Sequence, residues 1–362
     1  MKKKIITLVL ILILLILALS GCLDFFSENI TITYESHATS VMYIISYGYK
    51  VNCTGIGKYR IIYNCDLPEV INGQIIDIFI HNSEYHDALL ATWNNVKSWD
   101  INSSLNTEYD LGITATVQVQ SFIVSDLNGG NALTIQEIKD QYPDLMAQYT
   151  KPQSNDTTVF VNPYDPNIAN IASQVLNRAG TNNAFLVAKE LFKWLKQYTT
   201  YETHFENDVA QTASYTLQCK KGDCDDLSFL YISLCRSLEI PARFIRGFLV
   251  EKNNAVRHAW VEVFVGGGLG NDGWIPVECA GISSSIESEI HQNFGIENVE
   301  HLRVFKDDGS NESLNISLLG LNYRMYNINR KIDANSYNDI ISYSVIKTQQ
   351  LVIDEEDRRA YK

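Results

Sequence analysis

The chain has 362 residues, a formal net charge of -13 at pH 7 and a pI near 5.0. A chain of this length exceeds what one hydrophobic core usually spans, so we expect two domains. The acidic balance argues against nucleic acid or anionic lipid as a partner. After the N-terminus, no stretch of the sequence is long and apolar enough to predict a transmembrane helix.

The N-terminus predicts export. A charged "MKKK" precedes an apolar run from Ile5 to Leu19, which only Thr7 interrupts, and "LSGC" then ends at Cys22. This order is typical of an export signal over residues 1–22. Its ending resembles a lipobox, which would place a lipid on Cys22; an uncleaved signal anchor is the alternative. In either case we expect the bulk of the chain to be extracellular and tethered to the outer face of the cell membrane.

The cysteines do not indicate a disulfide framework, which would be denser and more evenly spaced in a chain of this size. The pairing of Cys53 with Cys65 is left open, because the two lie in neighbouring strand-like stretches. Cys22 apart, the cysteines are Cys53, Cys65, Cys219, Cys224, Cys235 and Cys279.

Residues 23–130 predict an all-β domain. Short segments rich in β-branched and aromatic residues alternate with turn residues there. In "GITATVQVQSFIV", residues 112–124, apolar and polar side chains alternate from Ile113 to Gln120. One apolar and one polar face indicate an antiparallel sheet, and we therefore predict a β-sandwich-like domain. The other expected strands are "ITITYES", "SVMYIISYGYKV", "YRIIYNCDL" and "QIIDIFI".

A linker with entry helices is expected over residues 131–182, and a second, α+β domain over 183–362. "NAFLVAKELFKWLKQY" and Asp225–Glu239 have helical spacing, and the second of these helices is apolar on nearly all sides, as a buried central helix would be. Strands "RFIRGFLV", "RHAWVEVFV" and "GWIPVECA" follow, and "GGGLGNDG" predicts a hairpin loop between the last two. We expect Ser283–Lys362 to extend this domain. His291 and His301 fall there and are assigned no role.

Cys224 lies at the start of the predicted central helix. Asp223 is placed as its N-cap and Asp226 follows three residues later, which is a variant of the capping box. The first helical turn favours a thiolate by roughly 0.3–1 kcal/mol, whereas the flanking carboxylates oppose it. Activation of Cys224 therefore requires a nearby imidazole.

His258 is well placed to supply that imidazole. It begins the strand "RHAWVEVFV", and Glu278 ends the strand that the hairpin would bring alongside. A carboxylate beside His258 would fix the ring tautomer. Cys224, His258 and Glu278 would then be the nucleophile, base and orienting acid of thiol acyl transfer. Spacing alone leaves a structural interpretation open for all three.

The blocks "GDCDDLSFLYISLCRSLEIPARFIRGF", "RHAWVEVFV" and "GWIPVEC" together resemble the core of the transglutaminase-like superfamily over about 100 residues. The resemblance implies a papain-like α+β fold and gives Cys224, His258 and Glu278 the roles of nucleophile, base and orienting acid. The family usually has Asp where this chain has Glu278, so an extra methylene must be accommodated. Gln218 matches the oxyanion-hole amide of papain-like enzymes, with a surface glutamine as the alternative.

A metal site built from Cys219, Cys224, Cys235 and Cys279 is disfavoured. Cys235 lies about 16 Å from Cys224 along one helix, and no pair has CxxC spacing. We expect Cys235 and Cys279 to be small core residues. A disulfide between Cys219 and Cys224 would block the nucleophile and is not expected. The sequence implies no cofactor and has no calcium-binding loop.

These features predict a membrane-anchored extracellular thiol enzyme. It would attack an amide carbonyl, form a thioester and pass the acyl group to water or to an amine. We favour hydrolysis of a peptide or isopeptide bond in a substrate at the cell surface, because water is abundant and nothing marks an amine site. The competing hypothesis is a non-catalytic surface module that keeps the fold for binding or adhesion.

Overall fold

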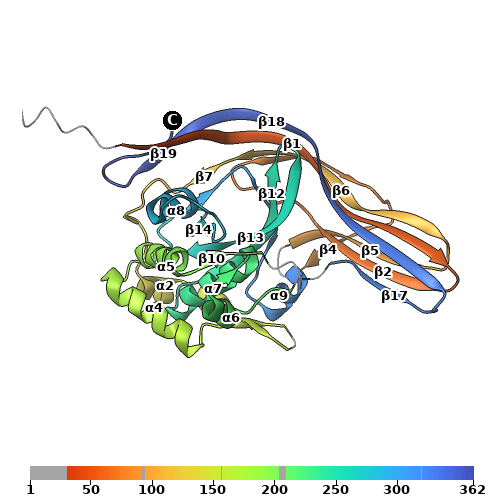
Figure 1. Cartoon of the computed structure of the whole chain (residues 1–362), viewed down its shortest axis with the longest axis horizontal. Coiled ribbons are helices and arrows are strands. Elements are labelled where there is room, and N and C mark those ends of the chain that lie inside the picture. Colours follow the sequence, from red (N-terminus) through yellow and green to blue (C-terminus); the bar gives the residue numbers. More distant parts are fainter. Residues whose placement is uncertain (1–30, 91–93, 156, 204–208, 319) are drawn as a thin grey trace, which may run out of the picture.

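The computed structural model describes residues 31–362 apart from 91–93, 156, 204–208 and 319 (Figure 1). The export signal and Cys22 lie outside these residues. Within the described part, no helix is long and apolar enough to cross a membrane. The helices are α2 (Ile135–Gln141), α3 (Pro143–Tyr149), α4 (Pro166–Ala179), α5 (Ala184–Tyr198), α6 (Ala213–Cys219), α7 (Cys224–Ser237), α8 (Ile286–Asn293) and α9 (Asn311–Leu318).

Two antiparallel sheets contain the strands predicted in the N-terminal part. Both contribute to one hydrophobic cluster, in which Ile45 and Ile113 are fully buried. The cluster also takes in Phe248 and Leu302 from the second half of the chain, so a separate β-sandwich domain stays a prediction. The strand order of the first sheet is β19 (Arg359–Tyr361), β18 (Arg330–Ile353), β1 (Ile32–Gly55), β6 (Thr107–Gln120), β3 (Gln74–Ile80). The strand order of the second sheet is β17 (Asn322–Met325), β2 (Tyr59–Asp66), β5 (Asn94–Ser103), β4 (His86–Leu90).

The C-terminal residues differ from expectation. Instead of extending the second domain, β18 returns to pair with β1, from Ile353 opposite Ile32 to Arg330 opposite Gly55. β17 likewise pairs with β2. Figure 1 shows the resulting ribbon running along one side of the molecule. The first sheet is therefore built from both ends of the chain, a pairing across about 300 residues that leaves no local signal in the sequence.

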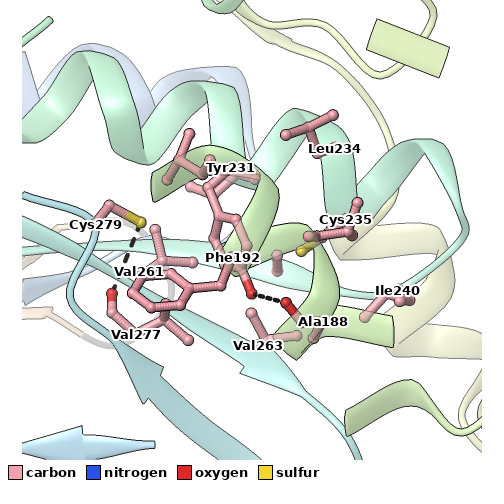
Figure 2. Packing of buried hydrophobic residues seen from close by; sticks show 14 of the residues in the cluster. Ala188, Phe192, Tyr231, Leu234, Cys235, Ile240, Val261, Val263, Val277 and Cys279 are labelled. Atoms are coloured by element: carbon pink, nitrogen blue, oxygen red, sulfur yellow. Dashed lines mark hydrogen bonds between the residues drawn. The ribbon is translucent and has the colours of Figure 1, made fainter. Parts of the chain in front are cut away.

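Helix α7 is the centre of the second core. It packs against α4, α5 and α6 on one side and against β13 and β12 on the other, and its residues from Asp226 to Arg236 are all buried, as predicted. Figure 2 shows Cys235 and Cys279 among the apolar side chains of this core, where both are fully buried. They are small core residues, as expected. The sheet runs β14 (Trp274–Val277), β13 (Asn254–Phe264), β12 (Ala242–Glu251), β16 (His301–Lys306).

Short helices and strands connect the two cores, and the ends of α4 follow from capping residues in the sequence. Asp165 caps α4 by accepting from two main-chain N–H groups, Pro166 begins the helix, and Gly180 ends it in the left-handed conformation. These residues determine where α4, the helix that leads into the second core, begins and ends. The remaining strands are the pairs β8 (Gln153–Ser154) with β9 (Val159–Val161), β10 (Thr200–Tyr201) with β11 (Lys221–Gly222), and β7 (Phe122–Ile123) with β15 (Ile296–Glu297).

Every cysteine within the described residues is a free thiol. This includes Cys53 and Cys65, whose pairing the sequence left open. Both are buried in the core that the two large sheets share, and burial raises the pKa of Cys65 to about 12. Cys219 and Cys224 are also unbridged, so Cys224 keeps the thiol that a nucleophile needs.

Candidate active site

Two hydrogen bonds accepted by the Asp226 carboxylate fix the start of α7. The main-chain N–H of Asp223, the N-cap residue, donates to Asp226 Oδ2 over 3.1 Å. Asp226 Oδ1 accepts from the main-chain N–H of Gln211 at 2.6 Å. A Cβ on Gly222 would lie 2.5 Å from the Cβ of Asp226, so a larger residue there would displace the helix start. These contacts hold Cys224 as the first residue of α7.

The Cys224 thiol is partly buried beside carboxyl groups. Burial raises the pKa of the thiol well above its ordinary value, and the charges of Asp225 and Asp223 raise it further. A hydrogen bond from the main-chain N–H of Ala259 acts in the opposite direction. The helix end therefore does not produce a free thiolate by itself. A reaction at this sulfur would need a base to take the proton.

Asp225 retains a proton more readily than an ordinary aspartate. Burial is the main cause that raises its pKa, and the hydrogen bond and charge of Asp223 add to it. When Asp225 is protonated, Cys224 faces less negative charge than the three aspartates around it in the sequence suggest.

His258 lies on β13, beside the hairpin that the Gly-rich loop closes. β13 and β14 pair with Val261 opposite Val277, which confirms that hairpin. Glu278 follows β14 directly, and its Oε2 lies 2.7 Å from Nε2 of His258. The structure thus brings together the histidine and the acid that the sequence placed side by side. When Nε2 carries the proton, Nδ1 is the nitrogen able to accept another.

Cys224 begins α7, which packs against β13. The main-chain N–H of Ala259, which directly follows His258 in that strand, acts to lower the pKa of the Cys224 thiol. Ala259 and Val261 face the core around α7, whereas the ring of His258 stacks on that of Trp260 with centroids 6.0 Å apart. Cys224 is thus near the strand that carries His258, and the charge of Glu278 is among the causes that raise the pKa of its thiol.

Three N–H groups meet the Glu278 carboxylate. Oε1 accepts from the main chain of Ala280 at 2.6 Å. Oε2 accepts from His258 and also from Nε2 of His301, the latter at 2.8 Å. Burial alone would raise the pKa of Glu278, but the charges and hydrogen bonds of the two histidines outweigh burial and hold that pKa well below its usual range. Glu278 is consequently an anion at neutral pH.

His301 is the site residue that sequence reasoning missed. It begins β16, which lies next to β12 on the side away from β13. Its ring meets the Trp260 ring edge-on, with centroids 4.8 Å apart. The one signal available in "HLRVF" was alternation, which puts His301 and Arg303 on one face of a strand. Nothing local in the sequence indicates which strand β16 would join.

A buried charge network supports the sheet behind this cluster. Glu262 bonds to Arg243 at 2.6 Å and to Arg303 at 2.7 Å. Arg303 continues to Glu297, which accepts from Nε1 of Trp260 at 3.2 Å. Each charge has an opposite partner, as burial requires. The network fixes the indole on which the His258 ring stacks.

The remaining candidates are less closely tied to the site. Tyr201 lies near it: burial first, and then the charges of Cys224 and Asp223, raise the pKa of Tyr201 to about 12. Gln218 is exposed on α6, which gives no support to an oxyanion role. Cys219 is a partly buried free thiol at the end of the same helix.

Among the residues that the structure describes, two groups of side chains could hold a metal ion. His258, Glu278 and His301 offer one set of ligand atoms, and Asp223, Cys224 and Asp225 offer another, each set lying within 4.8 Å. In the first set the distances of 2.7 and 2.8 Å from the imidazole nitrogens to Glu278 are those of hydrogen bonds.

Residues 170–279 match the family model of the transglutaminase-like superfamily. This segment is a transglutaminase-like core, as the three sequence blocks implied. No curated protein matches the chain. Among solved structures, a candidate cysteine protease from Cytophaga hutchinsonii is similar, with a TM-score of 0.54 and 15% identity, over 86% of this chain and 93% of that chain. This likeness shows a common fold along most of both chains.

Two further structures show weaker likeness. The periplasmic domain of TgpA from Pseudomonas aeruginosa has a TM-score of 0.33 and 10% identity, over 64% of this chain and 86% of that chain. A transglutaminase from red sea bream has a TM-score of 0.30 and 9% identity, over 83% of this chain and 72% of that chain.

Proposed function

Because residues 170–279 form a transglutaminase-like core, we propose that this chain is a cysteine enzyme that uses Cys224 as nucleophile, His258 as base and Glu278 as orienting acid. One observation carries the proposal. His258 lies 2.7 Å from the Glu278 carboxylate, on the strand against which α7, the helix that begins with Cys224, packs. This arrangement supports the roles of nucleophile, base and orienter for the three groups.

The first half-reaction forms a thioester. As the sulfur of Cys224 attacks the carbonyl carbon of an amide, its proton passes to Nδ1 of His258. The carbonyl oxygen becomes an oxyanion, which the main-chain N–H groups of the first turn of α7 stabilise. The C–N bond then breaks, the leaving amine takes the proton from His258, and the acyl group remains on sulfur. Glu278 holds the imidazole ring and balances its charge while it carries that proton.

The second half-reaction releases the acyl group. Water gives a proton to His258 and attacks the thioester, and the sulfur leaves and regains the proton. An amine in place of water would give cross-linking. We favour hydrolysis of a peptide or isopeptide bond because water is the abundant acceptor. A peptide or protein at the cell surface is the proposed substrate, and a lipid on Cys22 or an uncleaved signal is the proposed tether.

Asp223 and Asp226 act on the nucleophile through the helix. Their hydrogen bonds fix the start of α7, and with it the position of Cys224. They are therefore positioning residues in this mechanism, not acids or bases. Gln218 is left out of it because its side chain is exposed.

The test compares wild type with Cys224→Ala in a mixture of peptides and a labelled primary amine. We expect the wild type to create new peptide termini and Cys224→Ala to create none. Cys219→Ala, the other partly buried thiol of this region, is the matched control and should behave as wild type. Incorporation of the amine without new termini would show that the enzyme cross-links its substrate instead of hydrolysing it. If the wild type gives neither new termini nor amine incorporation, the result favours the non-catalytic binding module.

A further inference from the structure

Glu278 poses a positioning problem that an aspartate would not. Its side chain has one more rotatable bond, so its carboxylate can turn away from His258 unless something holds it. A misplacement of about 1 Å in a catalytic group can cost roughly a hundredfold in rate. The carboxylate nevertheless lies 2.7 Å from Nε2 of His258. Other contacts of the Glu278 carboxylate must therefore fix it in this position.

We propose that His301 is a positioning residue for this site, which fixes the longer acid by donating its Nε2 proton to the same oxygen that His258 binds. The inference rests on the proposed function of Cys224, His258 and Glu278. With Oε1 held by Ala280 and Oε2 held by His301, rotation of the carboxylate would break two buried hydrogen bonds. Glu278 is thereby kept in the orientation that presents Nδ1 of His258 to the thiol.

The surroundings of His301 indicate a role beyond packing. The side chain is 6% exposed, and within the described part of the chain its Nδ1 has no hydrogen-bond partner. A buried polar atom without a partner is costly, so an apolar residue would be the stable choice for a position that only filled space. The hydrogen bond with Glu278 is what the histidine gains here.

The charges around His301 fit a donor to an anion. Burial lowers the pKa of His301, but the hydrogen bond and charge of Glu278, together with the charges of Glu297 and Glu300, outweigh burial and raise it. Arg303, two residues further along β16, is neutralised by Glu297 and Glu262. The Nε2 proton that the proposal needs is thus favoured by every carboxylate that faces the ring.

The position of the ring is independent of Glu278. His301 lies opposite Leu249 in the pairing of β16 with β12, and its ring packs edge-on against Trp260. Trp260 is held in turn by Glu297. His301 is therefore a fixed point from which a flexible glutamate can be held.

The test measures the rate at which iodoacetamide alkylates Cys224, by peptide mass spectrometry between pH 5 and 9, in a Cys219→Ser background. We expect His301→Leu to slow the reaction at pH 7 by roughly tenfold to a hundredfold. His301→Gln should restore the rate to within about threefold, because its amide N–H can reach the same oxygen. His291→Leu removes a histidine of α8 that is equally buried but pairs with Tyr34 of β1, and the variant should react as the parent does.

A double-mutant cycle separates the role of His301 from packing. The shorter side chain of Glu278→Asp should not reach His301, so adding His301→Leu to it should slow the reaction by less than threefold. An equal loss in both backgrounds would overturn the proposal, as would wild-type rates in a folded His301→Leu protein. A stoichiometric metal ion that is lost with His301 would overturn it too, in favour of the His–Glu–His metal site. If His258→Ala leaves the rate unchanged, the proposed function fails, whatever His301 does.

Discussion

Glu278 stands where the sequence resemblance to the transglutaminase-like superfamily leads us to expect an aspartate, and its carboxylate accepts three hydrogen bonds. Its three donors come from β13, from β16 and from its own loop. The sequence indicated that the extra methylene had to be accommodated. The structure shows how: the longer side chain reaches a second histidine.

Replacing Glu278 with Gln should keep the size of the side chain and remove its charge. We expect turnover to fall by roughly a thousandfold or more, because a neutral amide can hold His258 in the wrong tautomer and does not balance its charge. Turnover of a substrate found in the peptide screen is the measurement. A Gln variant with wild-type turnover would show that the acid has no part in the reaction.

Glu262 should contribute to the acid limit of stability. Burial alone would raise its pKa, but Arg303 and Arg243 outweigh burial and lower it to about 2 from an ordinary value of 4.5. Because the folded pKa is depressed, the stabilisation is fully present above about pH 4.5 and is lost as pH falls towards 2. The contribution is about 3 kcal/mol.

Urea unfolding of wild type and Glu262→Gln between pH 7 and pH 3 checks this. At pH 7 we expect the variant to be less stable by roughly 3–5 kcal/mol, because it leaves two buried guanidinium groups without their partner. Its free energy of unfolding should also fall less steeply below pH 4.5. Glu239→Gln, which breaks an exposed pair with Lys139, is the control. Parallel acid limbs for wild type and Glu262→Gln would contradict the prediction.

At the residue scale, the sequence predicted the placements that depend on local signals. The helix start at Cys224 and the hairpin that puts Glu278 beside His258 are both present, whereas the catalytic roles of these residues stay a proposal. The position of His301 could not be predicted, because its place beside Glu278 depends on which strand β16 joins.

Among the elements, α7 depends most on how it begins. Its first turn carries Cys224, the proposed nucleophile, and Asp226 holds that turn by accepting from two main-chain N–H groups. Asp226 is fully buried, so these bonds cannot be replaced by water. The position of Cys224 therefore depends on this one carboxylate.

Asp226→Ala should lower the free energy of unfolding by about 3 kcal/mol, since it leaves two buried donors unpaired. Asp226→Asn keeps one acceptor oxygen and should lose roughly half as much. Asp140→Ala, on the exposed face of α2, should change the free energy of unfolding by less than about 0.5 kcal/mol. Denaturant unfolding measures all three. Equal losses for the Ala and Asn variants would show that the hydrogen bonds do not hold the helix start.

Elements with local periodicity were predicted well and those with distant partners were not. The buried central helix and the hairpin are present as α7 and β13–β14. β18 was expected as strand-like pieces, yet in a different domain, because the sequence of a strand does not identify its neighbour.

In the described part of the molecule, the first strand and the last two strands belong to one sheet. β1 is flanked by β18 on one side and by β6 on the other. Removing β18 would expose the long edge of β1 and open the core that both sheets share, where Ile332 of β18 is buried. The C-terminal residues are thus part of the N-terminal core.

A chain of residues 31–319 should therefore fail to stay monomeric, whereas 31–362 should be stable. We expect the truncated chain to aggregate through the exposed edge, and size-exclusion chromatography measures this. Supplying residues 320–362 as a separate chain should partly restore the monomer-sized complex. A truncated chain that remains monomeric and unfolds cooperatively would contradict the pairing of β18 with β1.

The central claim, that His258 takes the proton of Cys224, is tested most directly by the alkylation rate of Cys224 against pH in wild type and in His258→Ala. Cys219 in the same protein serves as the reference thiol. Because burial and the neighbouring aspartates raise the pKa of the thiol, we predict that Cys224 reacts rapidly well below pH 8.5 only when His258 is present. Slow labelling with the same pH profile in both proteins would contradict the claim.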